Sequence, residues 1–264
     1  MTAALEARGV GVSFGGVRAL DGVDVVVQPG EIVGLIGPNG AGKTTFFDCV
    51  TGLIPGEGQV LVDGRDVSGL PAHERSRAGL GRSFQDARLF ASMTVLDVLT
   101  VAGERHQPRS PGVLKTLLGF DGIAEAKARK TAAEVIETFG LQAYRDKLVG
   151  ELSTGTRRVV DLAGILVQRP TVVLLDEPSS GLAQREAEAL VPLLQRVRAD
   201  LSCALLVIEH DMPLLLDIAE RLYALETGRV IAQGLPQDVV HDPEVVRSYL
   251  GDDPAAIARS GSTR

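Results

Sequence analysis

The sequence predicts an α/β protein built on a parallel sheet, and two patterns indicate this. Residues 31–36 form an apolar, strand-like run that passes through a glycine-rich turn directly into a helical pattern. After residue 151, helical and strand-like segments alternate, and strands that are separated by helices pair in parallel through crossover connections. With 264 residues, 45% of them apolar and 23% charged, the chain can bury a substantial core.

The first half of the chain is expected to supply a strand, a helix and a hairpin. The strand at 31–36 leads into a helix that begins near Gly42. Residues 59–62 and 65–67 flank Asp63-Gly64, a pair that tolerates the positive φ angles of a type I′ turn. We therefore expect a short antiparallel hairpin at this position.

From about residue 87 to residue 150 the pattern becomes helical. The clearest helix covers residues 125–139 and is ended by Gly140. Its apolar face comprises Ala132, Val135, Ile136 and Phe139. Residues 107–112 contain two prolines and are expected to form a loop.

Beyond residue 151 the elements expected in order are a helix, a strand, a helix, a strand and a hairpin. The two strands are at 172–175 and 204–208, with the second helix at 185–198 between them, and the hairpin strands are at 223–225 and 229–232. No internal repeat is present. We expect residues 1–251 to form a single domain and residues 252–264, which are small and polar, to form a flexible tail.

Composition excludes several classes of protein. The net charge of −7 and the pI of about 5.2 disfavour a surface that coats nucleic acid. The apolar runs are only as long as strands, and the first residues have no signal-peptide pattern, so we expect a cytosolic chain without a membrane span. Cys49 and Cys203 lie in apolar surroundings and are expected to be reduced core thiols.

Residues 37–44 match G-x-x-x-x-G-K-[ST], the phosphate-binding loop. The glycines let backbone N–H groups turn inward around phosphate oxygens, and the following helix adds its positive end. Lys43 is expected to reach the β- and γ-phosphates and Thr44 to hold Mg²⁺. The predicted nucleotide-binding residues of this segment are Gly37, Pro38, Asn39, Gly40, Ala41, Gly42, Lys43, Thr44 and Thr45.

Two carboxylates end the next apolar strand. Asp176 and Glu177 follow 172–175, at the carboxyl edge where open α/β sheets bind ligands. Adjacent acids there are costly unless a cation meets them, so Asp176 is expected on the Mg²⁺ side. Glu177 can act as the general base that polarises the attacking water.

Two further residues indicate a function only in combination with the phosphate-binding loop. His210 follows the apolar strand at 204–208 and can donate a hydrogen bond to the γ-phosphate from the same edge. Gln85 is a neutral amide that can reach Mg²⁺ or water. Alone, a histidine after a strand is more often a satisfied loop residue, and the glutamine carries almost no information.

The segment 152–156 has two interpretations. Ser153 can cap a helix whose apolar residues follow at helical spacing. A cap alone does not require Gly155, however, so the segment can also be half of a binding site whose other half lies elsewhere. A hydroxyl and a close backbone N–H at a helix N-terminus both suit a phosphate.

Together these residues resemble the ATP-binding-cassette (ABC) ATPases, along nearly the whole chain. Gln85 matches that family's Q-loop and His210 its switch histidine, and Phe14 lies where an aromatic ring commonly stacks on adenine. The family's signature motif corresponds to Leu152, Ser153, Thr154, Gly155 and Thr156. The resemblance implies a P-loop NTPase cassette: a RecA-like α/β core, an antiparallel β subdomain and a helical subdomain inserted at about 86–151. It also implies ATP and Mg²⁺, the latter held by Thr44, Gln85 and Asp176.

The sequence departs from the family pattern at three positions. The signature more usually contains LSGGQ, whereas Thr154 replaces the first glycine and Thr156 the glutamine. Ala183 stands where an Asp or Asn is commoner and bridges the two subunits. These departures leave undecided how strongly the two subunits communicate, whereas we still expect catalysis by Glu177.

Within the family, the segments ARLFASMTVLDVL, VIEHDM and VVRSYLGD resemble the ATPase subunits of branched-chain amino-acid importers. The implied partners are a second ABC ATPase subunit, identical or homologous, two transmembrane permease subunits and, indirectly, an extracytoplasmic solute-binding protein, with no nucleic acid. The implied location is the cytoplasmic face of the membrane. Two alternatives remain: a soluble ABC ATPase linked to nucleic acid or ribosomes, and a monomeric P-loop kinase or GTPase, which leaves 151–158 without a role.

Overall fold

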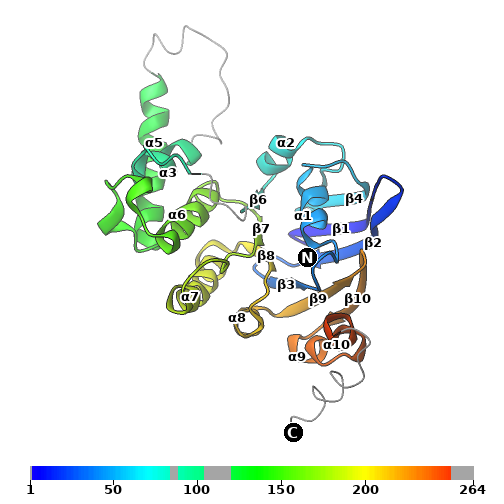
Figure 1. Ribbon diagram of the computed structural model, residues 1–264. Coiled ribbons are helices and arrows are strands. Elements are labelled where there is room, and N and C mark those ends of the chain that lie inside the picture. The colour runs from blue at the N-terminus through cyan, green and yellow to red at the C-terminus, as the bar shows by residue number, and fades with distance from the viewer. Residues whose placement is uncertain (1, 84–88, 104–119, 251–264) are drawn as a thin grey trace.

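Two β-sheets organise the chain in the computed structural model, which describes residues 2–83, 89–103 and 120–250 (Figure 1). One sheet has six strands in the order β10-β9-β3-β8-β7-β6, and the other has four in the order β2-β1-β4-β5. The strands are β1 Leu5–Phe14, β2 Val17–Val27, β3 Ile32–Ile36, β4 Glu57–Val62, β5 Arg65–Asp66, β6 Leu80–Arg82, β7 Val172–Asp176, β8 Ala204–Ile208, β9 Arg221–Glu226 and β10 Arg229–Gly234.

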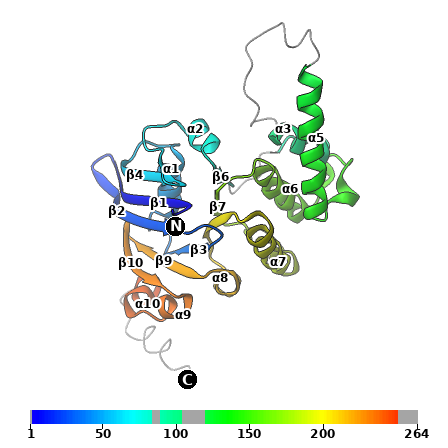
Figure 2. The same cartoon turned by 180° about the vertical axis from the view of Figure 1, so that it is seen from behind.

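Helices surround these sheets. They are α1 Lys43–Thr51, α2 Ala72–Arg77, α3 Val95–Gly103, α5 Phe120–Thr138, α6 Thr154–Leu166, α7 Gln184–Leu201, α8 Met212–Ile218, α9 Pro236–Val240 and α10 Pro243–Leu250, with short 3₁₀ helices at Gln142–Tyr144 and Val149–Glu151. Figures 1 and 2 show α3, α5 and α6 grouped away from the antiparallel strands β1, β2 and β4. Among the described residues, no helix combines the length and apolarity that crossing a membrane requires.

The predicted parallel core is confirmed. Strand β3 pairs in parallel with β8 and β9, and β7 pairs in parallel with β8 and β6, while β10 closes the sheet antiparallel to β9. Every residue of β3, β7 and β8 is buried, as expected for strands that are covered on both faces.

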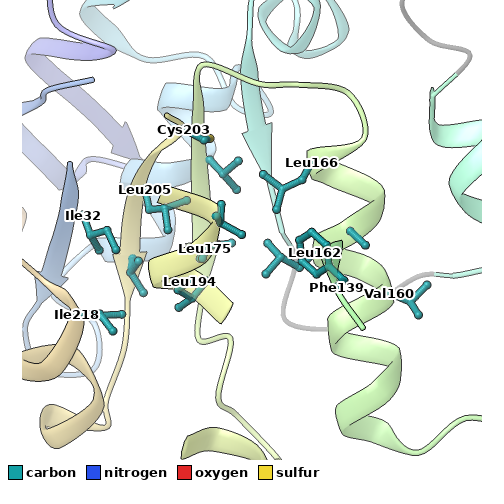
Figure 3. Packing of buried hydrophobic residues seen from close by; sticks show 14 of the residues in the cluster. Ile32, Phe139, Val160, Leu162, Leu166, Leu175, Leu194, Cys203, Leu205 and Ile218 are labelled. Carbon is teal, nitrogen blue, oxygen red and sulfur yellow. The ribbon is translucent and has the colours of Figure 1, made fainter. Parts of the chain in front are cut away.

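Alternate side chains of these strands enter two separate cores. Ile32, Leu175 and Leu205 pack with α7, α8 and the helical group, whereas Val33 and Leu35 pack with α1 and the antiparallel sheet. Figure 3 shows the first cluster continuing from the sheet through Leu166 to α6. One continuous apolar cluster therefore ties the helical group to the sheet.

Local patterns predicted the expected elements well. The Asp63-Gly64 turn has the two positive φ angles, 49° and 73°, that a type I′ turn needs, and it joins β4 to β5. The predicted helix at 125–139 is part of α5, with Phe139 just beyond its end. Both cysteines are free and buried. The proline-containing loop at 107–112 and the tail at 252–264 lie outside the described residues.

Candidate functional site

Three adjacent parallel strands end at one edge of the sheet and carry the predicted site there. Strand β3 ends at Ile36 and leads through residues 37–42 into α1. Its neighbour β8 ends at Ile208 and leads to His210, and the next strand, β7, ends at Asp176. The expectation that these residues share the carboxyl edge is therefore confirmed by the topology.

The phosphate loop has a backbone that only glycine allows at two of its positions. Gly37 has a φ of 147°, and a Cβ there would lie 2.1 Å from the carbonyl oxygen of Leu225. Gly42 has a φ of 104°, and a Cβ would lie 3.0 Å from the carbonyl oxygen of Ala19. Both glycines are thus required by the close approach of neighbouring backbone, which fixes the loop at the N-terminus of α1.

Lys43 is buried within this loop. Its Nζ donates hydrogen bonds to the carbonyl oxygens of Gly37, at 2.6 Å, and Pro38, at 3.0 Å. Burial lowers the pKa of Lys43, and the charges of Glu177 and Asp176 oppose that shift. An anionic phosphate is a better acceptor for this ammonium group than two neutral carbonyls are.

Asp176 offers an oxygen suited to a cation. It is 4% exposed, and within the described residues its Oδ1 is buried without a hydrogen-bond partner. Its Oδ2 lies 3.5 Å from Nη2 of Arg82, whose Nη1 also contacts Asp48 at 2.5 Å. Burial raises the pKa of Asp176, and the Arg82 guanidinium opposes the rise. Mg²⁺ commonly takes one or two protein oxygens plus phosphate oxygens, and Asp176 and Thr44 fit that demand.

Glu177 and His210 contact each other at the mouth of the site. His210 Nε2 lies 3.1 Å from Glu177 Oε1, and the histidine is 44% exposed. Glu177 has a φ of 47°, and its N–H donates to the carbonyl of Ile208 at 2.9 Å. A non-glycine residue in this conformation is uncommon, and such residues cluster at functional sites.

A pocket of about 370 Å³ joins the loop to this pair. Its lining residues are Val17, Arg18, Ala19, Asn39, Gly40, Ala41, Gly42, Lys43, Thr44, Thr45, Glu177, His210 and Thr227. Of these, Val17, Arg18, Ala19 and Thr227 were not expected from the sequence, since nothing local relates β2 or the β9–β10 turn to the loop. Phe14 is half-exposed at the end of β1 and does not line the pocket, although it pairs with Val17 across the sheet. Gln85 lies outside the described residues.

The signature segment 152–156 also does not line this pocket, and α6 lies with the helical group away from α1 (Figures 1 and 2). Ser153 caps α6, because its Oγ accepts a hydrogen bond from the N–H of Thr156 at 3.2 Å. Gly155 lies against the carboxylate of Glu186, where a Cβ would come within 2.4 Å of Oε1 and the glutamate side chain would have to move. The cap interpretation is thus confirmed, and it leaves the phosphate-binding interpretation open.

Comparison with known proteins agrees with the site. The sequence profile of the family described as ABC transporter matches residues 20–180, and that of the branched-chain amino acid ATP-binding cassette transporter matches residues 229–255. The high-affinity branched-chain amino acid transport ATP-binding protein BraF of Pseudomonas aeruginosa is 37% identical over 94% of this chain and 98% of its own length. Its Escherichia coli counterpart LivG is 38% identical over the same shares. The E. coli lipopolysaccharide export system ATP-binding protein LptB is 34% identical over 95% of this chain and 98% of its own.

Solved structures show the same architecture. A nucleotide-free ATP-binding cassette from an ABC transporter superimposes with a TM-score of 0.82 at 29% identity, over 96% of this chain and all of that one. An ATP-binding cassette of an ABC transporter in its ADP conformation gives a TM-score of 0.81 over the same shares. Given the phosphate loop, the paired carboxylates and these relatives, the chain belongs to the ABC transporter family as one of its ATP-binding cassette ATPases.

Proposed function

We propose that this chain hydrolyses ATP to power the import of branched-chain amino acids, or a similar small solute, through separate permease subunits. The observation that carries the proposal is the pocket that unites Lys43 and the loop with Glu177 and His210 at one sheet edge. The loop N–H groups and Lys43 bind the phosphates, Glu177 accepts a proton from the attacking water, and His210 donates to the γ-phosphate.

Mg²⁺ is held in this proposal by Thr44, Asp176 and Gln85. When bound, the cation neutralises charge that develops on the phosphate oxygens. The buried Oδ1 of Asp176, which has no hydrogen-bond partner among the described residues, supports this assignment. Phe14 stacks on adenine beyond the end of β1, next to the pocket residue Val17.

A second ABC ATPase subunit, identical or homologous, completes each ATP site with its own residues 152–156. The support is that these residues lie outside the pocket, whereas Ser153 and Gly155 stand at the N-terminus of α6, where the helix dipole favours an anion. Two ATP molecules are then held between two subunits.

Transport requires membrane partners. Relatives that are 37% and 38% identical to this chain are named as branched-chain amino acid transport ATP-binding proteins, and the family matched at 229–255 is described as a branched-chain amino acid ATP-binding cassette transporter. We infer two permease subunits, an extracytoplasmic solute-binding protein, and attachment at the cytoplasmic face of the membrane. Residues 86–151 form the inserted helical subdomain in this proposal, within a single domain that ends at 251, and the surface beside Gln85 contacts the permease.

The test combines hydrolysis and uptake. Glu177→Gln should still bind ATP but hydrolyse it at least about 10²-fold more slowly, because the amide cannot accept the proton. Deleting the gene should lower uptake of labelled leucine, and wild type but not Glu177→Gln should restore it. The exposed Glu188, on α7, supplies the control Glu188→Gln, which should behave as wild type.

Two results would contradict the proposal. Unchanged hydrolysis by Glu177→Gln would remove Glu177 as the base. Normal uptake of leucine and of other small solutes after deletion would favour the alternative, a soluble ABC ATPase in a nucleic-acid or ribosome-linked process. The acidic net charge of −7 disfavours that alternative.

A further inference from the structure

Glu209 is a buried carboxylate to which the mechanism above gives no role. It lies between β8 and His210 and is only 2% exposed. Its Oε1 accepts a hydrogen bond from the N–H of Ser179 at 2.8 Å, and its Oε2 accepts one from the N–H of His210 at 3.1 Å. None of the ion pairs in the described ranges includes Glu209. Two backbone amides, in place of a cation, therefore satisfy this buried charge.

The hydrogen bond to Ser179 crosses from the loop after β8 to the loop after β7, and the one to His210 holds Glu209 against the next residue of its own loop. Strands β7 and β8 are neighbours whose last residues, Asp176 and Ile208, face each other in register. The chain then continues to Glu177 and Ser179 on one side and to His210 on the other. Glu209 bridges the two loops beneath the surface, whereas the Glu177–His210 contact bridges them at the mouth of the pocket.

The two bridges differ in what happens when ATP binds. Under the proposed mechanism, Glu177 must face water and His210 must face the γ-phosphate, so their direct contact is exchanged for contacts with the substrate. The Glu209 bridge uses only backbone N–H groups, which do not react. It can therefore persist through the cycle and keep the loop spacing constant.

A carboxylate suits this role because it offers acceptor oxygens to both amides at once. The side-chain amide of glutamine offers one acceptor oxygen, and its NH₂ group would face the second N–H. Glutamine at 209 would thus keep the shape of the side chain and lose one of the two hydrogen bonds. Since misplacing a reacting group by about 1 Å can cost about 10²-fold in rate, the spacing matters for turnover.

We propose that Glu209 is a positioning residue for ATP hydrolysis, which holds the loops after β7 and β8 so that Glu177 and His210 stay aligned on the substrate. The inference rests on the proposed hydrolysis by this chain. Turnover by wild type and by the control variant below tests that function separately from any effect at position 209.

The main test is Glu209→Gln in purified protein, with ATP turnover, ATP binding and melting temperature all measured. We expect kcat to fall about 10- to 100-fold while KM stays within about threefold, because Glu209 does not itself line the pocket and makes no hydrogen bond to the phosphate loop in the described part of the chain.

The matched control is Glu31→Gln. Glu31 is also buried and also accepts a backbone N–H, from Gln28 at 2.7 Å, but it precedes β3 at the opposite edge of the sheet and pairs with Arg221 as well, so its loss of stability should be at least as large. This variant should lose stability and keep kcat. If Glu209→Gln loses kcat no more than Glu31→Gln does, Glu209 serves folding alone and the proposal is wrong.

A double variant supplies a readout that a purely structural role would not move. Because Glu209 is proposed to align both Glu177 and His210, Glu209→Gln should reduce kcat by a smaller factor when His210 is already alanine than it does in wild type. If kcat of the double variant instead falls by the product of the two single-variant factors, the proposal is wrong. Should Glu209→Gln fail to fold, Glu209→Asp keeps the charge with a shorter reach and should show the same kcat loss. Failure of both variants to fold would assign Glu209 to folding and overturn the proposal as well.

Discussion

Lys43 shows how contacts within the protein can position a side chain for a phosphate. The buried ammonium donates to two loop carbonyls, which offsets part of the cost of taking it out of water. A phosphate must replace these contacts, and the net gain on binding is therefore smaller than an isolated ammonium–phosphate contact suggests. The carbonyl contacts also hold the side chain close to where the phosphates arrive, which reduces the entropy lost on binding.

Asp161, on α6, shows the opposite case of a charge that costs stability. Burial raises its pKa to about 6, with Arg158 opposing the shift. Because the folded-state pKa lies above the unfolded value of about 3.9, the folded state binds more protons between about pH 4 and pH 6, and this residue makes stability fall as pH rises through that window. The penalty is fully present at pH 7.

Asp161→Asn should therefore stabilise the protein by about 1–2 kcal/mol at pH 7 and by much less at pH 4, where the folded-state carboxyl group is protonated and that of the unfolded state is about half protonated. Urea denaturation at several pH values measures this difference. The control is Asp146→Asn, whose side chain is 86% exposed and whose stability should match that of wild type throughout. An equal gain at pH 4 and pH 7 would contradict the titration argument.

At the scale of elements, the C-terminal helix α10 reaches the first residue of the phosphate loop. The hydroxyl oxygen of Tyr249 accepts a hydrogen bond from the N–H of Gly37 at 2.6 Å. The ordinary pKa of a tyrosine already keeps the phenol protonated at neutral pH, and partial burial raises the pKa of Tyr249 further. The peptide groups of Gly37 are thereby held from both ends, through the N–H by α10 and through the carbonyl by Lys43.

Tyr249→Phe removes only that hydroxyl and should lower the free energy of unfolding by about 0.5–1.5 kcal/mol, since the Gly37 amide loses its partner. Tyr144→Phe is the matched control, because in the described part of the chain the Tyr144 hydroxyl makes no hydrogen bond and its ring contact with Lys147 is kept. Chemical denaturation of both variants checks the difference. Equal values for the two would show that α10 does not anchor the loop.

The elements that the sequence predicts well are those whose signal is local. The loop at 37–44, the Asp63-Gly64 turn and the buried strand at 204–208 each depend on neighbouring residues. The long strand β1 was not predicted, for a physical reason: its register shifts between Ala7, Val10 and Val12, so the alternation of its apolar residues is interrupted. Irregularities of this kind erase the period of two on which recognising a strand depends.

The contacts that position the site join residues that are far apart in the sequence, so they could not be predicted from it. Ser179 and Glu209 are 30 residues apart, and Gly37 and Tyr249 are 212 apart. A glutamate before a histidine and a tyrosine in a late helix have many uses, so neither pattern indicates its partner. Only the arrangement of β7, β8 and α10 around the loop brings these pairs together.

At the scale of the whole molecule, the phosphate loop and the signature segment occupy separate places. The pocket contains the loop, Glu177 and His210 but none of residues 152–156, and one apolar core holds α6 within the helical group. In the proposed dimer, a single chain thus presents two half-sites that do not meet. If a second subunit brings its signature to the loop, damage to either half-site should be complemented by a partner whose same half is intact.

Mixing two inactive variants tests this arrangement. Lys43→Ala spoils the loop and leaves the signature sound, whereas Ser153→Arg blocks the signature and leaves the loop sound. Each variant alone, as a homodimer, is damaged at both sites. In a mixed dimer both substitutions fall in one ATP site, and the other ATP site is intact. Random mixing makes about half of the dimers mixed, so up to about a quarter of all sites are intact. ATP hydrolysis should then partly return, provided that the two sites act independently.

The controls separate complementation from its alternatives. A monomeric P-loop enzyme shows no recovery at any mixing ratio. A helix cap alone gives a stability loss of about 1 kcal/mol for Ser153→Ala and leaves hydrolysis per folded molecule unchanged. Nucleotide-dependent dimerisation of each variant, measured by size-exclusion chromatography, shows whether mixed dimers form under the assay conditions. Where they form, recovered hydrolysis requires an intact loop and an intact signature from different chains, because no chain in the mixture carries both.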